Sequence, residues 1–203
     1  MKREEQKQQS KLKIINAALE EFGQNDYFTA STNNMCKNNG ISKGLLFHYF
    51  TTKDEIFMEC VKKCFDELSL YVEEHIHTSG GTIEEVLGRY MECRMEFFKE
   101  YPYYKKIFHT VVFNTPIHLA EEVEQSRKRL NEVNELFLSK VLENFELKDG
   151  INQAEVIRVI IDFGNFLLSK HRPKDNSEEG FMKELIEEFI EMMKMLFYGI
   201  IRE

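Results

Sequence analysis

The chain has 203 residues, of which 42% are hydrophobic and 31% are charged, a composition typical of a folded globular protein. No apolar run is long enough to cross a membrane, and the polar residues 1–11 lack the apolar stretch of a signal peptide. Membrane-spanning and secreted proteins are therefore excluded, and we expect a cytoplasmic protein whose four cysteines are reduced thiols.

The net charge of −8 is unevenly distributed along the chain. Residues 1–54 carry eight Lys or Arg and six Asp or Glu, so their net charge is +2, and the remaining residues carry −10. A basic head on an acidic body favours a polyanionic partner at one end. Only three prolines and ten glycines interrupt the chain, and alternating β-branched residues are scarce. The sequence therefore predicts an all-α fold with about nine helices.

The first 52 residues are predicted to form three helices, over residues 7–24, 32–38 and 42–50. Thr29 or Ser31 can cap the second helix, and Ser42 can cap the third. The turn between these two short helices ends at Gly40, which tolerates a left-handed backbone. Two short helices joined by a tight turn behind a longer one are organised like a helix-turn-helix. We therefore expect a DNA-binding domain over residues 1–52.

The third helix has an inward and an outward face. Its inward residues, Leu46 and Phe50, can dock on an apolar stripe of the first helix, formed by Leu12, Ile15, Leu19 and Phe22. The outward residues are Lys43, Gly44, Phe47 and His48. A lysine can neutralise phosphate, a glycine lets a backbone approach, and ring edges pack on sugar or thymine methyl groups. Lys53 begins the next helix, where its charge and the helix N-terminus could together hold a phosphate.

The segment from Ser42 to Lys53 reads Ser-Lys-Gly-Leu-Leu-Phe-His-Tyr-Phe-Thr-Thr-Lys. Together with the upstream Ala-Ala-Leu-x-x-Phe at residues 17–22, it resembles the tetracycline-repressor-like (TetR) family, whose motif ends in Ser-Lys-Gly-x-Leu-Tyr-x-Tyr-Phe-x-x-Lys. The resemblance implies a dimeric regulator that binds an inverted repeat in double-stranded operator DNA, with a helical ligand-binding and dimerisation domain over residues 53–203. The residues that we expect to contact DNA are Thr29, Ser42, Lys43, Gly44, Leu45, Phe47, His48, Tyr49 and Lys53.

The remaining helices are predicted over residues 53–77, 82–100, 102–113, 116–145, 152–170 and 179–201. Aromatic residues cluster around Pro102, where they could line a pocket for an apolar or amphipathic effector. Ordinary core packing is the alternative, and for Arg94 the alternative to pairing with an anionic ligand is a solvated ion pair. The candidate effector-binding residues are Phe65, Leu68, Arg94, Phe98, Tyr101, Tyr104, Phe108 and His109.

The last two helices are unusually apolar. The helix over residues 152–170 is apolar nearly all round, and the last helix carries two apolar stripes. A homodimer in which these helices form a four-helix interface explains both patterns, whereas a larger monomer core is the alternative. The residues expected at the dimer interface are Ile160, Phe163, Leu167, Phe189, Met193 and Leu196.

No catalytic motif is found, so we expect neither an enzyme nor a bound cofactor or metal. The favoured function is a repressor that a small apolar or amphipathic ligand releases from DNA. A ligand-independent or activating regulator is an alternative within the same class. A helical metal or redox sensor, or an enzyme, using Cys60, Cys64 and His77 is the alternative from another class. Cys60 and Cys64 lie on an apolar helical stripe, which favours their being buried small hydrophobes.

Overall fold

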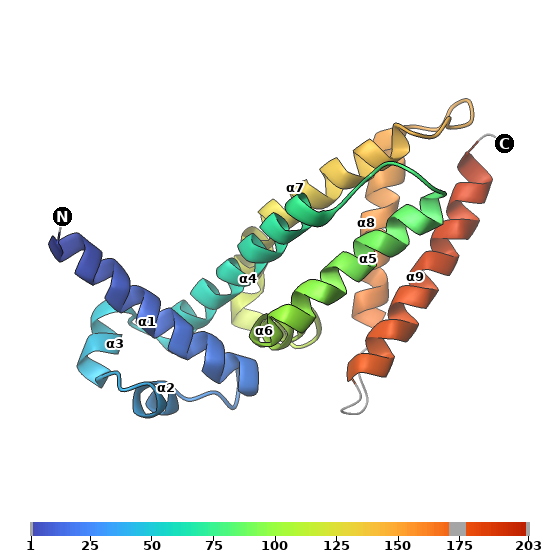
Figure 1. Ribbon diagram of the computed structural model, residues 1–203. Helices are drawn as coiled ribbons and strands as arrows, with labels where there is room; N and C mark the ends of the chain where they lie inside the picture. The colour runs from blue at the N-terminus through green and yellow to red at the C-terminus, as the bar shows by residue number, and fades with distance from the viewer. Residues whose placement is uncertain (1, 171–177, 202–203) are drawn as a thin grey trace. The chain divides into compact units, whose positions relative to one another are not determined.

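The computed structural model describes residues 2–170 and 178–201, which form nine α-helices and one short 3₁₀ helix, η1 (Figure 1). The helices are α1 (Lys2–Gln24), α2 (Thr32–Asn38), α3 (Lys43–Tyr49), α4 (Lys53–His75), α5 (Ile83–Glu100), α6 (Pro102–Phe113), η1 (Ile117–Leu119), α7 (Ala120–Leu142), α8 (Gln153–Lys170) and α9 (Glu178–Ile200). Over these ranges the one β-type pairing is an isolated bridge between Leu147 and Ile201. The prediction of an all-α fold is confirmed. None of the helices described is both long and apolar enough to span a bilayer.

The chain divides into two compact units. The first unit comprises Met1–Leu68 and Phe97–Lys128, and the second comprises Ser69–Glu96 and Arg129–Glu203. The first unit thus holds the three N-terminal helices together with the start of α4, the whole of α6 and η1. A domain boundary after residue 52 stays a prediction.

The predicted helix over residues 116–145 is wrong in one respect. Pro116 has an extended backbone with ψ of 125°, and the chain makes the short helix η1 before α7 starts at Ala120. Proline lacks the amide hydrogen and restricts its own φ, so the chain re-enters helical geometry only gradually at this point. The loop expected between the last two helices falls mostly on residues 171–177, outside the described residues.

The buried face of α1 differs from the expected stripe. Ile14, Ala17 and Phe22 are at most 1% exposed, whereas Leu12 is 51% exposed and Ile15 is half-buried. The reason is that α1 packs against both α2 and α6, so two neighbours determine its buried face. Periodicity alone places a stripe on a helix but not the elements that will cover it.

The contact between α1 and α6 depends on a glycine. A Cβ atom added at Gly23 would lie 2.7 Å from the Cα of Tyr103, closer than real Cβ contacts. Gly23 therefore allows the backbones of α1 and α6 to approach closely. Nearby, the ring of Phe22 meets the ring of Phe57 edge-on at 5.0 Å between centroids, which packs α1 on α4 in the same unit.

Candidate DNA-binding site

The helix-turn-helix is held together by local caps. The hydroxyl of Ser31 accepts a hydrogen bond from the amide of Asn33 at 3.2 Å, and that of Ser42 accepts one from Leu45 at 3.1 Å. Gly40, in the turn between α2 and α3, has the left-handed φ of +59° that the sequence predicted. These are the expected caps and turn of two short helices, because a capping oxygen satisfies an amide that has no partner within the helix.

A buried carboxylate attaches α2 to α1. Glu21 is only 4% exposed, and its Oε1 accepts hydrogen bonds from the amide of Ser31 at 2.9 Å and the Asn34 side chain at 3.4 Å. A buried polar group of this kind is tolerated only when it is hydrogen-bonded. Sequence analysis did not identify this residue, because a glutamate near the end of an exposed-looking helix gives no local signal of its partners.

The exposed surface of α3 is the face that the sequence predicted. Leu46 and Phe50 are buried at 0% and 4%, and they anchor the helix to the rest of the head. The residues that project outward are Lys43, Gly44, Phe47 and His48. Ser42 and Thr29 are also exposed, and Leu45 is half-buried. The contacts of these residues with DNA stay a prediction.

Gly44 has no structural reason to be a glycine. A Cβ atom built at this position would meet nothing within 4 Å, and Gly44 is not among the glycines with positive φ. A helical glycine is less stable than alanine there, so neither packing nor backbone strain accounts for it. The open space beside Gly44 is compatible with the close approach of DNA, which stays a prediction.

Tyr49 and Thr29 both contact the chain itself. The hydroxyl of Tyr49 donates to the carbonyl of Lys7 at 3.1 Å, which ties the end of α3 to the first turns of α1. The hydroxyl of Thr29 donates to Asp26 Oδ1 at 2.8 Å within the loop between α1 and α2. Both side chains therefore fix the shape of the head, whatever contact they also make with DNA.

The structure gives Lys53 intramolecular contacts that the sequence did not predict. Its Nζ donates to the carbonyls of Tyr27 at 2.8 Å and Ala30 at 3.4 Å, and it lies 4.5 Å from the centroid of the Tyr27 ring. The ammonium group thus points into the loop before α2, because two carbonyl oxygens and an aromatic face attract it there. Lys53 holds the loop between α1 and α2. A contact of Lys53 with a DNA phosphate stays a prediction.

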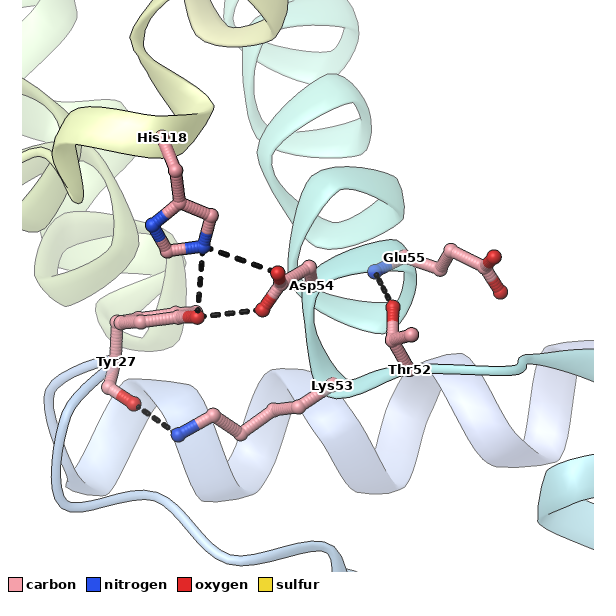
Figure 2. Close-up of polar contacts among 6 residues, drawn as sticks. All are labelled: Tyr27, Thr52, Lys53, Asp54, Glu55 and His118. Carbon is pink, nitrogen blue, oxygen red and sulfur yellow. Dashed lines mark hydrogen bonds and ion pairs between the residues drawn. The ribbon is translucent and has the colours of Figure 1, made fainter.

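Asp54, the residue after Lys53, binds the hydroxyl end of Tyr27 (Figure 2). Tyr27 Oη donates to Asp54 Oδ1 at 2.5 Å, and His118 Nε2 donates to Asp54 Oδ2 at 3.0 Å. His118 Nε2 also lies 3.4 Å from Tyr27 Oη. The three side chains come from the loop before α2, the first turn of α4 and η1. Sequence analysis found none of them.

These contacts change the acidities of two groups. The hydrogen bond from Tyr27 lowers the pKa of Asp54, with further lowering by His118 and Lys53 against a desolvation effect in the opposite direction. Burial and the adjacent Asp54 carboxylate raise the pKa of Tyr27 to about 12. At neutral pH the tyrosine is therefore a donor and the aspartate an ionised acceptor.

The start of α4 is itself fixed by a reciprocal cap. Thr52 Oγ1 accepts a hydrogen bond from the amide of Glu55 at 3.1 Å, and Glu55 Oε2 accepts one from the amide of Thr51 at 2.5 Å. The pattern Thr-x-x-Glu before an apolar helix is a capping-box signature. It places Lys53 and Asp54 in the first turn of a well-defined helix.

The residues predicted to bind an effector fall in two places. All except Arg94 lie in the first unit, where the ring centroid of Phe108 is 4.9 Å from that of Phe98 and 6.1 Å from that of Phe65. Arg94 lies in the second unit, where its Nη1 donates to the hydroxyl of Tyr90 at 3.2 Å. The structure therefore assembles an aromatic cluster within the first unit, whereas Arg94 belongs to the second unit.

The rest of this cluster extends along α6. The ring of Tyr104 stacks on that of Phe97 at 5.7 Å, and Tyr101 lies 5.1 Å from Phe97. Leu68 is fully buried, and the His109 ring is 4.6 Å from that of Phe113. An additional cation adjoins the cluster, since the Arg127 guanidinium lies 5.8 Å from the Phe65 ring centroid.

The residues predicted at the dimer interface lie mostly inside the single chain, and their place in a dimer stays a prediction. Four of them are at most 9% exposed within the single chain, namely Ile160, Leu167, Phe189 and Met193. The helices α8 and α9 contact each other, the rings of Phe163 and Phe189 stack between them at 6.5 Å, and Phe163 and Leu196 are half-buried. The exposed apolar residues of these two helices are Val159, Phe166, Met192, Met195 and Tyr198. A strongly apolar helix has more than one face that could be buried in the chain. Only the packing of the folded chain determines which face is buried.

The two cysteines on which the alternative of a metal or redox site rested lie in the core. Cys60 and Cys64 are at most 1% exposed, and burial raises the pKa of the Cys60 thiol, so its thiolate form is disfavoured. Across the described ranges, no group of three or more His, Cys, Asp or Glu side chains is arranged to hold a metal ion. The two cysteines behave as small hydrophobic core residues.

Residues 14–60 match the family model described as bacterial regulatory proteins, tetR family. The chain is 23% identical over 151 residues to the fatty acid metabolism regulator protein of Bacillus subtilis (strain 168), a match that covers 74% of this chain and 73% of that protein.

Two solved structures share the fold. One is the transcriptional regulator FadR from Bacillus subtilis in complex with stearoyl-CoA, with a TM-score of 0.63, 18% identity, and coverage of 90% of this chain and 96% of that one. The other is SmeT, the repressor of the Stenotrophomonas maltophilia multidrug efflux pump SmeDEF, with a TM-score of 0.63, 13% identity, and coverage of 94% and 90%.

Proposed function

The chain belongs to the TetR family of transcriptional regulators, and we propose that it is a homodimeric repressor that an amphipathic acyl ligand releases from operator DNA. The observation that carries the DNA-binding part is the exposed surface of α3, where a lysine, an aromatic ring and a histidine surround a glycine with open space above it. Such a surface suits phosphate contact and close backbone approach to a groove. We place its action in the bacterial cytoplasm.

The DNA-binding part is tested by selection from random double-stranded DNA, followed by titration of the selected duplex in fluorescence anisotropy. We expect an inverted repeat whose half-sites are separated by about one helical turn, roughly 34–36 Å, or a multiple of it. Lys43→Ala should weaken binding to all sequences and reduce the dependence on salt by about one unit per contact removed. His48→Ala should instead change the preferred bases. A library that yields no enriched sequence would refute this part.

The dimer is proposed to form through α8 and α9, by way of their exposed apolar residues. Phe166 is 55% exposed and Met192 is 38% exposed, and in a dimer both would be removed from water. Light scattering should report twice the chain mass of 24.1 kDa for the wild type. Phe166→Glu and Met192→Glu should each give the monomer mass. Leu136→Glu is the matched control, because Leu136 is 54% exposed but lies on α7.

The ligand is proposed to be a long-chain acyl-CoA. The supporting features are the aromatic cluster around Phe108, which suits an acyl chain, and the Arg127 guanidinium beside Phe65, which suits an anionic group. The Bacillus subtilis regulator with a similar fold was solved with stearoyl-CoA, which makes that molecule the natural probe.

The ligand part is tested by adding stearoyl-CoA or free CoA to the protein on its selected duplex. Stearoyl-CoA should weaken DNA affinity by about 5- to 150-fold, the usual range of allosteric coupling, and CoA should not. Arg127→Gln should reduce the response, whereas Arg129→Gln, also on α7, should not. A run-off transcription assay should show less transcript with the protein and recovery with stearoyl-CoA. Sequence-specific binding that no acyl-CoA changes would instead identify a ligand-independent regulator.

A further inference from the structure

We propose that His118 is a positioning residue for the DNA-binding head, acting through Asp54 and Tyr27 on the loop that leads into α2. The inference rests on the proposed DNA-binding function and adds to it a residue far from the helix-turn-helix in sequence. We call Tyr27, Asp54 and His118 the polar joint. All three belong to the first unit of the structure.

The first step is that Tyr27 is held at both ends by α4. Lys53 donates to its carbonyl, and Asp54 accepts from its hydroxyl, so two consecutive residues of one helix fix one loop residue (Figure 2). The ring between them is 7% exposed and meets the Phe57 ring edge-on at 4.9 Å. Because Tyr27 is held at its backbone carbonyl, its ring and its hydroxyl, it cannot shift without the loop moving with it.

The second step is that this loop sets the position of α2. From Tyr27, the chain reaches the Ser31 cap through a turn in which the amide of Ala30 donates to the carbonyl of Asp26 at 2.9 Å. In the same segment, the amide of Thr29 donates to Asp26 Oδ1 and the amide of Ser31 donates to Glu21 Oε1, both at 2.9 Å. A displacement of Tyr27 is therefore passed over a short, hydrogen-bonded segment to the start of the helix-turn-helix.

The third step is that His118 holds the Asp54 carboxylate in the orientation that accepts the hydrogen bond from Tyr27. A carboxylate can only accept hydrogen bonds, so Nε2 of His118 must carry the hydrogen that bonds Asp54 Oδ2. With His118 in place, Asp54 has one oxygen for the histidine and the other for Tyr27. Without His118, the carboxylate can rotate or turn to solvent, since its side chain is 38% exposed.

A second contact links the same stretch of chain to the head. Tyr103 of α6 covers Gly23 at the end of α1, and α6 leads through Pro116 into η1, which carries His118. The segment from α6 to η1 therefore contacts the head at the end of α1 and again at Tyr27 and Asp54. This second contact is apolar and tight. The polar joint, by contrast, can be broken by replacing a single side chain.

The test uses the full-length protein and a duplex that the wild type selects from random DNA. His118→Ala should weaken binding to this duplex by about 2- to 30-fold, if each of two heads loses a polar contact about as strong as an exposed surface pair. His118→Gln should stay close to the wild type, because its amide nitrogen can donate to Asp54. His77→Ala, which removes an exposed histidine outside the joint, should have no effect.

Two further readouts separate positioning from a general loss of stability. Tyr27→Phe should weaken binding by itself but add little in the His118→Ala background, since both changes break the same joint. Hydrogen exchange of His118→Ala without DNA should be faster at the amides of residues 29–31 and unchanged in α9. Equal affinity and exchange for His118→Ala and the wild type would overturn the proposal, as would equal losses for the Ala and Gln variants or strictly additive effects.

Failure of the proposed function gives a different result. If the wild type enriches no DNA sequence, sequence-specific binding is refuted, while the exchange of residues 29–31 still decides whether the joint positions the loop. If the wild type binds its selected duplex and His118→Ala binds it equally well, DNA binding stands and the positioning role is refuted.

Discussion

Gly44 provides a prediction in which fold stability and DNA affinity change in opposite directions. A Cβ at this position meets nothing within 4 Å of the chain, so Gly44→Ala introduces no clash. Replacing a helical glycine by alanine stabilises a helix by up to about 0.5–1 kcal/mol, since alanine loses less backbone entropy. Gly44 lies in the first turn of α3, so we expect the lower part of that range.

DNA affinity should fall in the same variant. An added methyl group on the outward face holds the α3 backbone away from the groove. The loss of one directly read base pair, about 1–3 kcal/mol or about 5- to 150-fold in affinity, gives the scale of the effect for one head. Gly44→Leu should abolish binding to the selected duplex and also to unrelated sequences, because its longer side chain blocks the whole approach.

The assay combines thermal unfolding with anisotropy titrations of the selected duplex and a scrambled duplex. Gly88→Ala is the matched control, because a Cβ there also meets nothing within 4 Å but Gly88 lies on α5. The control should gain stability and keep its DNA affinity. A Gly44→Leu protein that binds the selected duplex as tightly as the wild type would refute the assignment of the α3 face as the DNA-reading surface.

Four further predictions follow from the head. Glu21→Ala should lower the free energy of unfolding by about 1.5–3 kcal/mol in denaturant titrations, because a buried charged acceptor of the Ser31 amide is lost; an unchanged unfolding midpoint would contradict this. Gly23→Ala should destabilise the fold by about 1–3 kcal/mol through overpacking against Tyr103, whereas Gly88→Ala should not. Equal unfolding midpoints for the two variants would count against a close contact between α1 and α6. The pKa of Asp54 is lowered in the folded protein, so its contribution to stability is complete above the unfolded-state pKa and is lost as pH falls through the folded-state pKa. Asp54→Asn should therefore flatten the acid side of a curve of stability against pH. The pKa of Tyr27 is raised to about 12, so its contribution to stability is complete below the ordinary pKa of 10.0 and is lost as pH rises toward 12. An absorbance titration of the tyrosines in the wild type and in Tyr27→Phe should detect the raised pKa.

The sequence by itself determined the local features of the head. Ser31 and Ser42 cap their helices as expected, because a cap acts over two or three residues and needs no distant partner. The turn at Gly40 follows from the conformational freedom of glycine. The outward face of α3 follows from helical periodicity once Leu46 and Phe50 are known to point inward.

The tertiary structure decided everything that depends on which element lies opposite. Lys53 is predicted to contact phosphate from its charge and its place at a helix start, which are local, whereas its intramolecular partners, the carbonyls of Tyr27 and Ala30, come from a separate loop. The same holds for the bond between His118 and Asp54, whose residues lie 64 positions apart. Periodicity likewise identified apolar α8 and α9 without showing which face each turns to the other. A sequence pattern encodes the properties of one element, whereas the direction of an amine, the partner of a carboxylate and the covered side of a helix are properties of two elements in contact.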